Sequence, residues 1–404
     1  MVKKFSNREK LEFFFLPISV VGFFGLMQYL HWPVLRTWNI KGVLDFGDLN
    51  SVLGSADCYR LIGFRIYEYP LGHECAYNYG SWLMKTIQLL NLWESYTSVI
   101  GWFFLILMSL FISLLVIKVS KRFDLRLLTL LMFVSPPVML LVERGNLDIL
   151  IFMLVLVGSY AASCQKNTLG LAVIVLSFLY KFYTLGLVVI HLLRLRSKTK
   201  KVVWFTILGL ATWQVFLDLG RGPGLINIQW ASFGSPVFGI YLGYLGIQIP
   251  YTFSMILGWF LLGLAVFVFT SEKTPLKRVL NSCKELQFEN KGIYFIFISL
   301  IIIHTFCYLF GMNFDYRLIF MATANVLLIS QSQLSKRLSQ ILGVWTVLIM
   351  WLSFNVVLLQ PIGDLLIGFM TALYLFFILW HAQREYESLF KVSWISLLHR
   401  KSHQ

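Results

Sequence analysis

A few ionisable side chains interrupt long apolar stretches of this chain, and their types could do chemistry. They are Glu143, Arg144 and Asp148 in VERGNLDI, Lys181 in LYKFYTL, and Asp315 and Arg317 in MNFDYRLIF. An ion at membrane depth is costly, so such residues usually face a cavity, find partners and carry out chemistry or transport. Arg144, Lys181 and Arg317 fall at ends of apolar stretches. Fixed positive charge there could bind a phosphate, and arginine offers a bidentate fork.

The acidic residues between the first two apolar stretches are candidates for a general base. They are Asp45, Asp48, Asp57, Glu68 and Glu74. A carboxylate beside a cavity can take the proton of an attacking hydroxyl, although acids in loops are usually only solvated. We favour Asp48 because it opens a probable helix directly after the first apolar stretch, with Asp45 and Asp57 as rivals.

A structural alternative exists for the cations. Arg144 and Asp148 are four residues apart and could pair on one helix face. Arg317 could pair in the same way with Asp315. Lys181 has no acidic residue close by in the sequence, which favours an anionic ligand or a distant carboxylate.

The elements that position these residues are membrane helices. The chain of 404 residues is 58% hydrophobic and 13% charged, whereas a soluble domain is about 25% charged. Stretches long enough to cross ~30 Å of hydrocarbon recur, and lipid restricts spanning segments of this kind to helices. The sequence therefore predicts an all-α polytopic bundle, residues 1–404 forming a single integral membrane domain. We expect about twelve spans, near 13–31, 96–117, 127–142, 148–164, 168–180, 183–193, 202–219, 251–270, 292–311, 318–330, 339–358 and 362–380.

The formal net charge of +15 is an orientation signal. Most Lys and Arg residues fall in segments that share one side of the membrane if the N-terminus is cytoplasmic. This distribution predicts that both termini are cytoplasmic and argues against a nucleic-acid partner. No small-residue cleavage site follows the first span, which indicates an uncleaved anchor. A bacterial inner membrane is the expected location, with the cations near the extracytoplasmic face.

Two extracytoplasmic loops are long. The first, 32–95, contains an apolar stretch at 82–93 that is too short to span and suits the membrane interface. It also contains Cys58 and Cys75, which could form a disulfide or remain free thiols. The second, 220–250, is rich in glycine and could be a lid or a plain connector.

Two breaks are expected within the helices. Ser135-Pro136-Pro137 should bend the third span, because proline removes a helix hydrogen bond. Residues 168–193 should form two short helices that meet near Lys181. His191 and His304 fit buried hydrogen-bonding residues. The sequence has no His or Cys cluster with metal-ligand spacing and no nucleotide-binding motif. No cofactor is therefore predicted, although a divalent cation would be compatible with the sequence.

Four local patterns resemble the GT-C superfamily of polytopic glycosyltransferases, in particular its polyprenyl-phosphate-mannose-dependent α-mannosyltransferase-like branch. Their residues are Asp48, Leu49, Gly63 and Tyr67; the stretch SPPVMLLVERGNLD; Lys181, Phe182 and Tyr183; and the stretch NFDYRL. Two departures concern the donor. Thr184 and Leu185 follow where the family often has a proline, and YNYGSWL at 77–83 has glycine in the proline position.

The resemblance implies transfer of a hexose from a polyprenyl-phosphate donor to an extracytoplasmic lipid or glycan acceptor, with inversion. Asp48 would be the base, and Arg144, Lys181 and Arg317 would bind the donor phosphate. Supporting residues would be Asn146, Asp148, Tyr183, Asp315 and Asp57. Two other functions remain open. A transporter of lipid-linked saccharides would need interrupted helices in both halves, and a surface-polysaccharide polymerase would make long products.

Overall fold

The computed structural model describes most of the chain. The described residues are 46–63, 75, 77, 79–119, 123–195, 197–221, 232–244, 246–270, 288, 291–310, 313–330, 334–353 and 359–379, together with Phe14, Ile18, Ser19 and Gly22. Most of the expected first span, 13–31, lies outside them. So do Asp45, Glu68, Glu74 and Tyr67, as well as the side chain of Asp315.

The described chain is helical except for one short strand pair, and its apolar helices indicate a membrane-embedded protein. Four helices are long and apolar enough to cross a membrane. They are Glu94–Ile117, Tyr251–Val268, Gly292–Leu309 and Gln360–Leu379. A fifth candidate is the bent pair of α5 (Phe123–Phe133) and α6 (Pro136–Glu143).

Four expected spans are helices that are short for a full crossing. They are Asp148–Ser163, Asn167–Tyr180, Phe182–Leu193 and Ile319–Ile329, each of 10–17 residues. A helix rises 1.5 Å per residue and needs about 20 residues to cross the hydrocarbon. The described residues therefore give four or five candidate spans, fewer than the sequence predicts.

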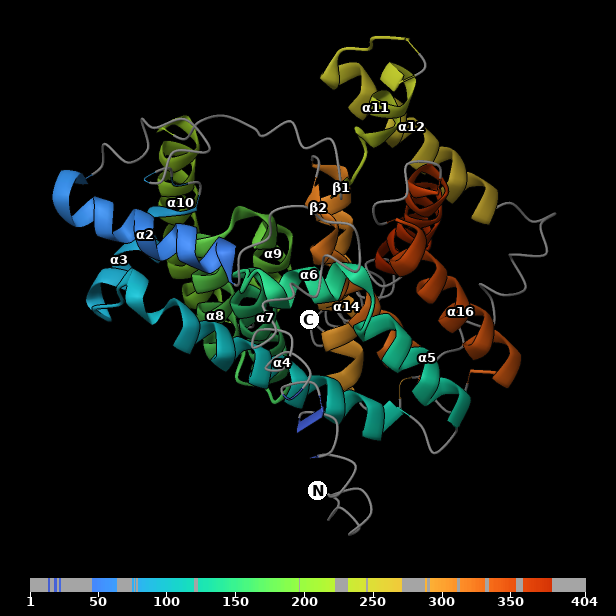
Figure 1. Ribbon diagram of the computed structural model, residues 1–404, viewed down its shortest axis with the longest axis horizontal. Helices are drawn as coiled ribbons and strands as arrows, with labels where there is room; N and C mark the ends of the chain where they lie inside the picture. The colour runs from blue at the N-terminus through green and yellow to red at the C-terminus, as the bar shows by residue number, and fades with distance from the viewer. Residues whose placement is uncertain are drawn as a thin grey trace, which may run out of the picture.

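The helices pack around a central group, with smaller sets at either side (Figure 1). At the centre lie α7 (Asp148–Ser163), α8 (Asn167–Tyr180), α9 (Leu185–Leu193) and α14 (Lys291–Leu309). On one side lie α2 (Gly47–Ile62), α3 (Ser81–Leu89) and the first part of α4 (Thr97–Val119). On the other lie α5 and α16 (Lys336–Leu352), which contact α15 (Ile319–Ile329).

The hairpin of α7 and α8 is built on a close approach between two glycines. A Cβ on Gly170 would lie 2.7 Å from the carbonyl oxygen of Gly158. Small residues let helix backbones approach closely in membranes. This approach packs α8 against α7. Because the two helices form a hairpin, the end of α8 lies near the start of α7.

Both predicted helix breaks are present. α5 and α6 meet at 51°, at the Ser135-Pro136-Pro137 sequence. At the second break, Lys181 is extended (φ −147°, ψ 124°) between α8 and a 3₁₀ turn, η4 (Phe182–Thr184), that leads into α9.

The described part of the first loop contains α2 and α3, in the two places where the sequence predicts a helix at Asp48 and an interfacial stretch at 82–93. α2 begins at Gly47, as the sequence predicts for the region of Asp48. α3 (Ser81–Leu89) covers the first eight residues of the expected interfacial stretch and buries Leu83, Met84 and Ile87. The structure has a disulfide between Cys58 and Cys75, whose Cα atoms are 5.6 Å apart. It closes a loop of 17 residues, which in the chain-entropy account contributes about 3 kcal/mol.

We call residues 232–244 the strap. It contains β1 (Ser232–Phe233) and α11 (Val237–Tyr244), and β1 pairs antiparallel with β2 (Asn313–Phe314). The backbone N–H of Ser235 donates to the carbonyl of Tyr308 at 2.8 Å. The Tyr241 hydroxyl donates to the buried carboxylate of Asp364. This part of the 220–250 loop is therefore an ordered element attached at several points.

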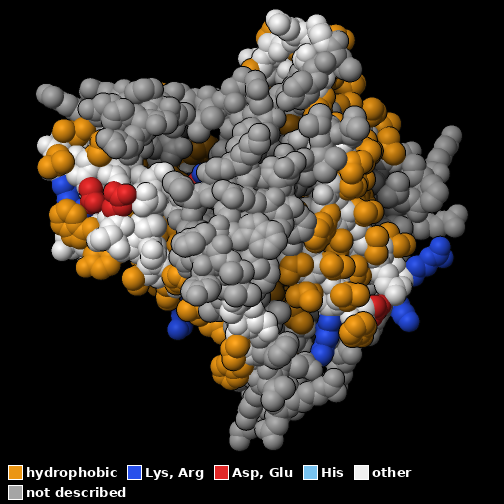
Figure 2. All heavy atoms as spheres, in the orientation of Figure 1, with side chains coloured by type: hydrophobic (Ala, Val, Ile, Leu, Met, Phe, Trp, Pro, Cys, Tyr) orange, Lys and Arg blue, Asp and Glu red, His pale blue; other side chains and the backbone are white. Residues whose placement is uncertain are grey.

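The described surface in the view of Figure 2 is mostly apolar over the region of α5 and α16. Lys and Arg side chains gather near its lower right edge. An apolar band with basic residues at one edge is the pattern of a surface that contacts lipid.

Candidate functional site

The site begins at the N-terminus of α2, where Asp48 contacts two side chains from the turn that follows α6. Arg144 forms an ion pair with Asp48, its Nε donating to Oδ1 at 2.5 Å. Asn146 Nδ2 donates to the other oxygen, Oδ2, at 2.5 Å. Both oxygens of the carboxylate are therefore fixed by residues almost a hundred positions later in the sequence.

Backbone contacts explain why α2 begins at this place. The N–H groups of Asp48 and Leu49 both donate to the carbonyl of Arg144, at 3.0 Å and 3.3 Å. Gly145 adopts φ 58°, a conformation that favours glycine, and a Cβ there would lie 3.2 Å from Leu49 and Phe46. The Arg-Gly-Asn turn thus accepts the free N–H groups at the start of α2 and packs directly against it.

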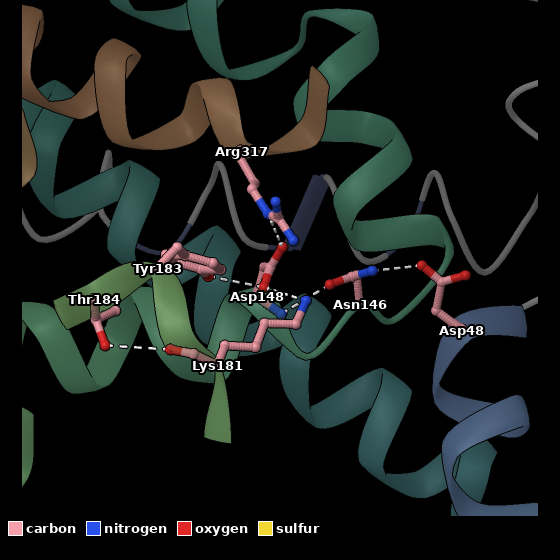
Figure 3. Close-up of polar contacts among 7 residues, drawn as sticks. All are labelled: Asp48, Asn146, Asp148, Lys181, Tyr183, Thr184 and Arg317. Atoms are coloured by element: carbon pink, nitrogen blue, oxygen red, sulfur yellow. Dashed lines mark hydrogen bonds and ion pairs between the residues drawn. The ribbon is translucent and has the colours of Figure 1, made fainter. Parts of the chain in front are cut away.

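A second carboxylate, Asp148, lies at the start of α7 and has no exposed surface. Lys181 Nζ lies 2.6 Å from its Oδ1, and the Tyr183 hydroxyl donates to the same oxygen at 2.8 Å. Arg317 Nε donates to Oδ2 at 3.1 Å. Figure 3 shows these side chains converging on Asp148 from separate segments. A buried carboxylate needs such partners because leaving it unpaired is costly.

Asn146 joins the two carboxylates. Its amide nitrogen donates to Asp48, while its Oδ1 accepts from the backbone N–H of Asp148 at 2.8 Å. Figure 3 shows Asn146 between the two aspartates. The connected set, which we call the charge cluster, is Asp48, Arg144, Asn146, Asp148, Lys181, Tyr183 and Arg317.

Two tyrosine rings lie close to two of the cations, Lys181 and Arg317. Lys181 Nζ lies 4.6 Å from the centroid of Tyr79, and the Arg317 guanidinium carbon lies 4.6 Å from that of Tyr183. Burial raises the pKa of Tyr79 well above its usual value, and the charges of Asp48 and Asp148 raise it further. The Tyr79 phenol is therefore protonated beside both carboxylates.

Exposure increases from one end of the charge cluster to the other. The side chain of Asp148 is fully buried, those of Lys181 and Arg317 are 11% and 16% exposed, and that of Arg144 is 32% exposed. Arg144 is therefore the side chain that a ligand reaches most readily, while Asp48 beside it is 16% exposed, as Arg317 is.

The structure brings together most of the expected site residues, but with long-range pairs. Arg144 pairs with Asp48 and Arg317 pairs with Asp148, whereas sequence proximity suggested Asp148 for Arg144 and Asp315 for Arg317. The side chain of Asp315 lies outside the described residues. Lys181 pairs with Asp148, which is the distant carboxylate that the sequence allowed as one of two possible partners.

Asp57 belongs to a different set of contacts. It forms an ion pair with Arg60 and accepts the backbone N–H of Glu94 at 3.2 Å. It lies nine residues after Asp48 on α2, about 13 Å along the helix axis. Its contacts hold the end of α2 to the segment before α4, so it neither supports the charge cluster nor competes with Asp48 within it.

Sequence reasoning missed Tyr79, although it noted the surrounding YNYGSWL stretch. The missing signal is the close approach of Gly80 to α8. A Cβ on Gly80 would lie 2.1 Å from the carbonyl oxygen of Leu179, and the Gly80 N–H donates to the carbonyl of Tyr180 at 3.3 Å. This contact brings Tyr79 beside Lys181.

Among the described residues, no three His, Cys, Asp or Glu side chains gather in a way that could hold a metal ion. Of the histidines, His304 pairs with Thr371 at 3.1 Å, and His191 is buried next to the ring of Phe295. Both lie apart from the contacts that define the charge cluster.

No protein-family model, curated protein or solved structure matches this chain. What the protein does must therefore be inferred from its own side chains and their arrangement.

Proposed function

We propose that the protein is a membrane glycosyltransferase of GT-C type. It would move a hexose, mannose-like, from a polyprenyl-phosphate donor to a lipid or glycan acceptor. About twelve spans, a bacterial inner membrane and an extracytoplasmic site belong to this proposal. The resemblance of the Asp48, Arg-Gly-Asn, Lys181 and NFDYRL elements to that superfamily supports it.

The observation that carries the proposal is the composition of the charge cluster. Three cations from three separate segments, Arg144, Lys181 and Arg317, converge on the two carboxylates of Asp48 and Asp148. Asp148 holds Lys181 and Arg317 in place without using all of their donors, since an ammonium has three N–H groups and a guanidinium five. Such a site suits a phosphate and the charge that grows on it when it leaves.

Asp48 is the acid best placed to act as the base. It lies at the more exposed end of the cluster, and each of its oxygens can accept further hydrogen bonds beside those from Arg144 and Asn146. A phosphate that draws Arg144 toward itself would weaken the ion pair and leave Asp48 Oδ1 able to accept the hydrogen bond of an acceptor hydroxyl.

The proposed reaction is a single displacement. Asp48 takes the proton of the acceptor hydroxyl, whose oxygen forms a bond to the anomeric carbon. The bond from that carbon to the phosphate oxygen breaks, and its electron pair stays on the polyprenyl phosphate beside Arg144, Lys181 and Arg317. Attack opposite to the leaving group inverts the anomeric configuration.

Sugar transfer tests the proposal directly. Purified protein in lipid would be given radiolabelled polyprenyl-phosphate hexoses and a membrane extract as acceptor. Asp48→Asn should abolish transfer. Asp57→Asn, a matched change on the same helix outside the charge cluster, should keep at least half of it. Transfer by Asp48→Asn at the wild-type rate would remove Asp48 from the mechanism.

The alternatives give different outcomes in the same preparation. If no hexose donor is used by a well-folded protein, and labelled lipid-linked saccharide crosses the bilayer of proteoliposomes, the protein is a transporter. The two helix breaks described, at Ser135 and Lys181, both lie in the first half of the chain, whereas a transporter of repeated halves would show them in both. Products of many residues would identify a polymerase.

A further inference from the structure

Tyr79 lies against the charge cluster without carrying a charge. It comes from the segment between the disulfide at Cys75 and the start of α3. Its ring is 4.6 Å from Lys181 Nζ, and the ring of Tyr77 lies behind it at 5.8 Å between centroids. Asp48, Asp148, Arg144 and Arg317 all lie close enough for their charges to act on its hydroxyl.

The Lys181 ammonium contacts two different groups, a carboxylate and an aromatic ring. Asp148 Oδ1 lies 2.6 Å from the ammonium, and the face of Tyr79 lies near it as well. The negative face of an aromatic ring attracts a cation, and the attraction grows when the pair is removed from water. Without the ring, the contact with Asp148 is what would fix the end of this four-carbon side chain, which has several rotatable bonds.

The backbone around Tyr79 is fixed on both sides. Gly80 donates to the carbonyl of Tyr180, the residue before Lys181, and the Tyr77 hydroxyl donates to the carbonyl of Gly80 at 3.2 Å. Asp218 from α10 (Lys198–Arg221) accepts the N–H of Ser81 at 2.9 Å, which caps α3. These hydrogen bonds therefore hold the segment that carries Tyr79 against the end of α8, next to Lys181.

We propose that Tyr79 is a positioning residue, whose ring holds the Lys181 ammonium so that a remaining N–H points toward the anionic group of the ligand. This rests on the proposed function for the identity of the ligand as a polyprenyl phosphate. The contact between Tyr79 and Lys181 stands without it. The hydroxyl of Tyr79 is not needed for this role, so its ring and its hydroxyl can be tested separately.

The test measures binding of undecaprenyl phosphate to the full-length protein in lipid nanodiscs. Tyr79→Phe keeps the ring and should bind within about 2-fold of wild type, whereas Tyr79→Leu should bind roughly 3-fold to 30-fold more weakly. Phe295→Leu is the matched control, because Phe295 lies 4.0 Å from the Arg194 guanidinium outside the charge cluster. It should bind as wild type does.

A double-mutant cycle separates positioning from general damage. In a Lys181→Met background, Tyr79→Leu should cause no further loss of binding, since it acts through the ammonium. An equal loss in both backgrounds, or unchanged binding by Tyr79→Leu, would overturn the proposal.

A failure of the proposed function would be recognised separately. If wild-type protein neither binds undecaprenyl phosphate nor transfers sugar, the same cycle is measured by thermal unfolding. Non-additive shifts in Tm would still show that Tyr79 holds Lys181. Additive shifts would show that it does not.

Discussion

At the scale of single residues, Asp148 organises more of the charge cluster than Asp48 does. Its two oxygens receive Lys181, Tyr183 and Arg317, and its own N–H is bound by Asn146. A buried carboxylate that balances two cations is a structural necessity, because removing it leaves both of them without their shared partner. Asp148 therefore fixes Lys181 and Arg317 in positions from which they could bind a ligand.

We therefore expect Asp148→Asn to destabilise the protein by about 3–5 kcal/mol, the usual cost of leaving buried charge unpaired. The measurement is the unfolding transition in detergent, followed by temperature or denaturant. Asp124→Asn is the control. Asp124 accepts from Gln340 at 2.9 Å on partly exposed α5, and because an asparagine oxygen can still accept this bond, the change should cost at most about 1 kcal/mol. Equal effects of the two changes would contradict the role given to Asp148.

Asn146→Ala should reduce transfer more than it reduces stability. It removes the donor to Asp48 Oδ2, so the carboxylate loses its orientation while its ion pair with Arg144 remains. Small displacements at a reacting group can cost about 10²-fold in rate, and we expect a loss of 10-fold to 100-fold in kcat, roughly. Asn167→Ala, at the opposite end of α8 from Lys181, should leave kcat unchanged.

The residues of the charge cluster could be predicted from sequence, but their partners could not. Isolated ionisable residues in apolar stretches are conspicuous, which is how Arg144, Asp148, Lys181 and Arg317 were recognised. Sequence proximity suggested local pairs, whereas the structure joins Asp48 to Arg144 and Asp148 to Arg317. Those contacts depend on tertiary packing, above all on the turn at Gly145 that meets the start of α2.

At the scale of elements, the close approach of the α3 start to the α8 end determines where Lys181 lies. Gly80 has an extended backbone (φ −63°, ψ 143°) that any residue can adopt, so its glycine is required by space rather than by backbone conformation. The carbonyl of Leu179 occupies the place that a side chain would need.

Gly80→Ala should therefore destabilise the protein by about 1–3 kcal/mol, the usual cost of overpacking. It should also weaken phosphate binding, because the backbone of Tyr180 must shift to make room. Gly209→Ala is the matched control. Gly209 lies within α10 with nothing within 4 Å of a new Cβ, and alanine should stabilise that helix by about 0.5–1 kcal/mol. Thermal unfolding of both variants measures the difference, and a shift of the same sign in both would contradict this account.

The helix breaks were predictable because their causes are local. The prolines at Ser135-Pro136-Pro137 bend the helix by themselves. The polar residue Lys181 interrupts an apolar stretch that is too long for one short helix. The strap was not predictable. Its glycines suggested an irregular loop, but α11 and the β1–β2 pairing depend on contacts with β2 and with Asp364, which are distant in sequence.

At the scale of the whole molecule, the distribution of basic residues predicts how the bundle lies in the membrane. The apolar described helices indicate a membrane-embedded chain, while the direction of insertion stays a prediction from sequence. The start of α10 should be cytoplasmic and the segment before α12 (Tyr251–Thr270) extracytoplasmic.

Single cysteines test this orientation in a Cys164→Ser, Cys283→Ser background. Thr199→Cys and Ile247→Cys both lie at exposed positions. A membrane-impermeant maleimide added to intact cells should label Ile247→Cys and should label Thr199→Cys only after permeabilisation. The reverse pattern would place the charge cluster on the cytoplasmic side and overturn the proposed location.

The described residues form fewer candidate spans than the sequence predicts. Apolar stretches such as 148–164 and 318–330 are as hydrophobic as spans, yet the helices formed there are 10–17 residues long. Hydropathy measures how apolar a stretch is. Where a helix ends depends on caps and turns, such as the turn at Gly145 before α7 and η5 (Asp315–Leu318) before α15.

The strap has a mechanical consequence for the molecule. β1 is bonded to Asn313 and Phe314, and Arg317 lies only three residues beyond that pairing. If the strap moves outward with its hydrogen bonds intact, it pulls on the backbone that carries Arg317 and draws the guanidinium away from Asp148. Outward movement of the strap and separation of Arg317 from Asp148 would then occur together.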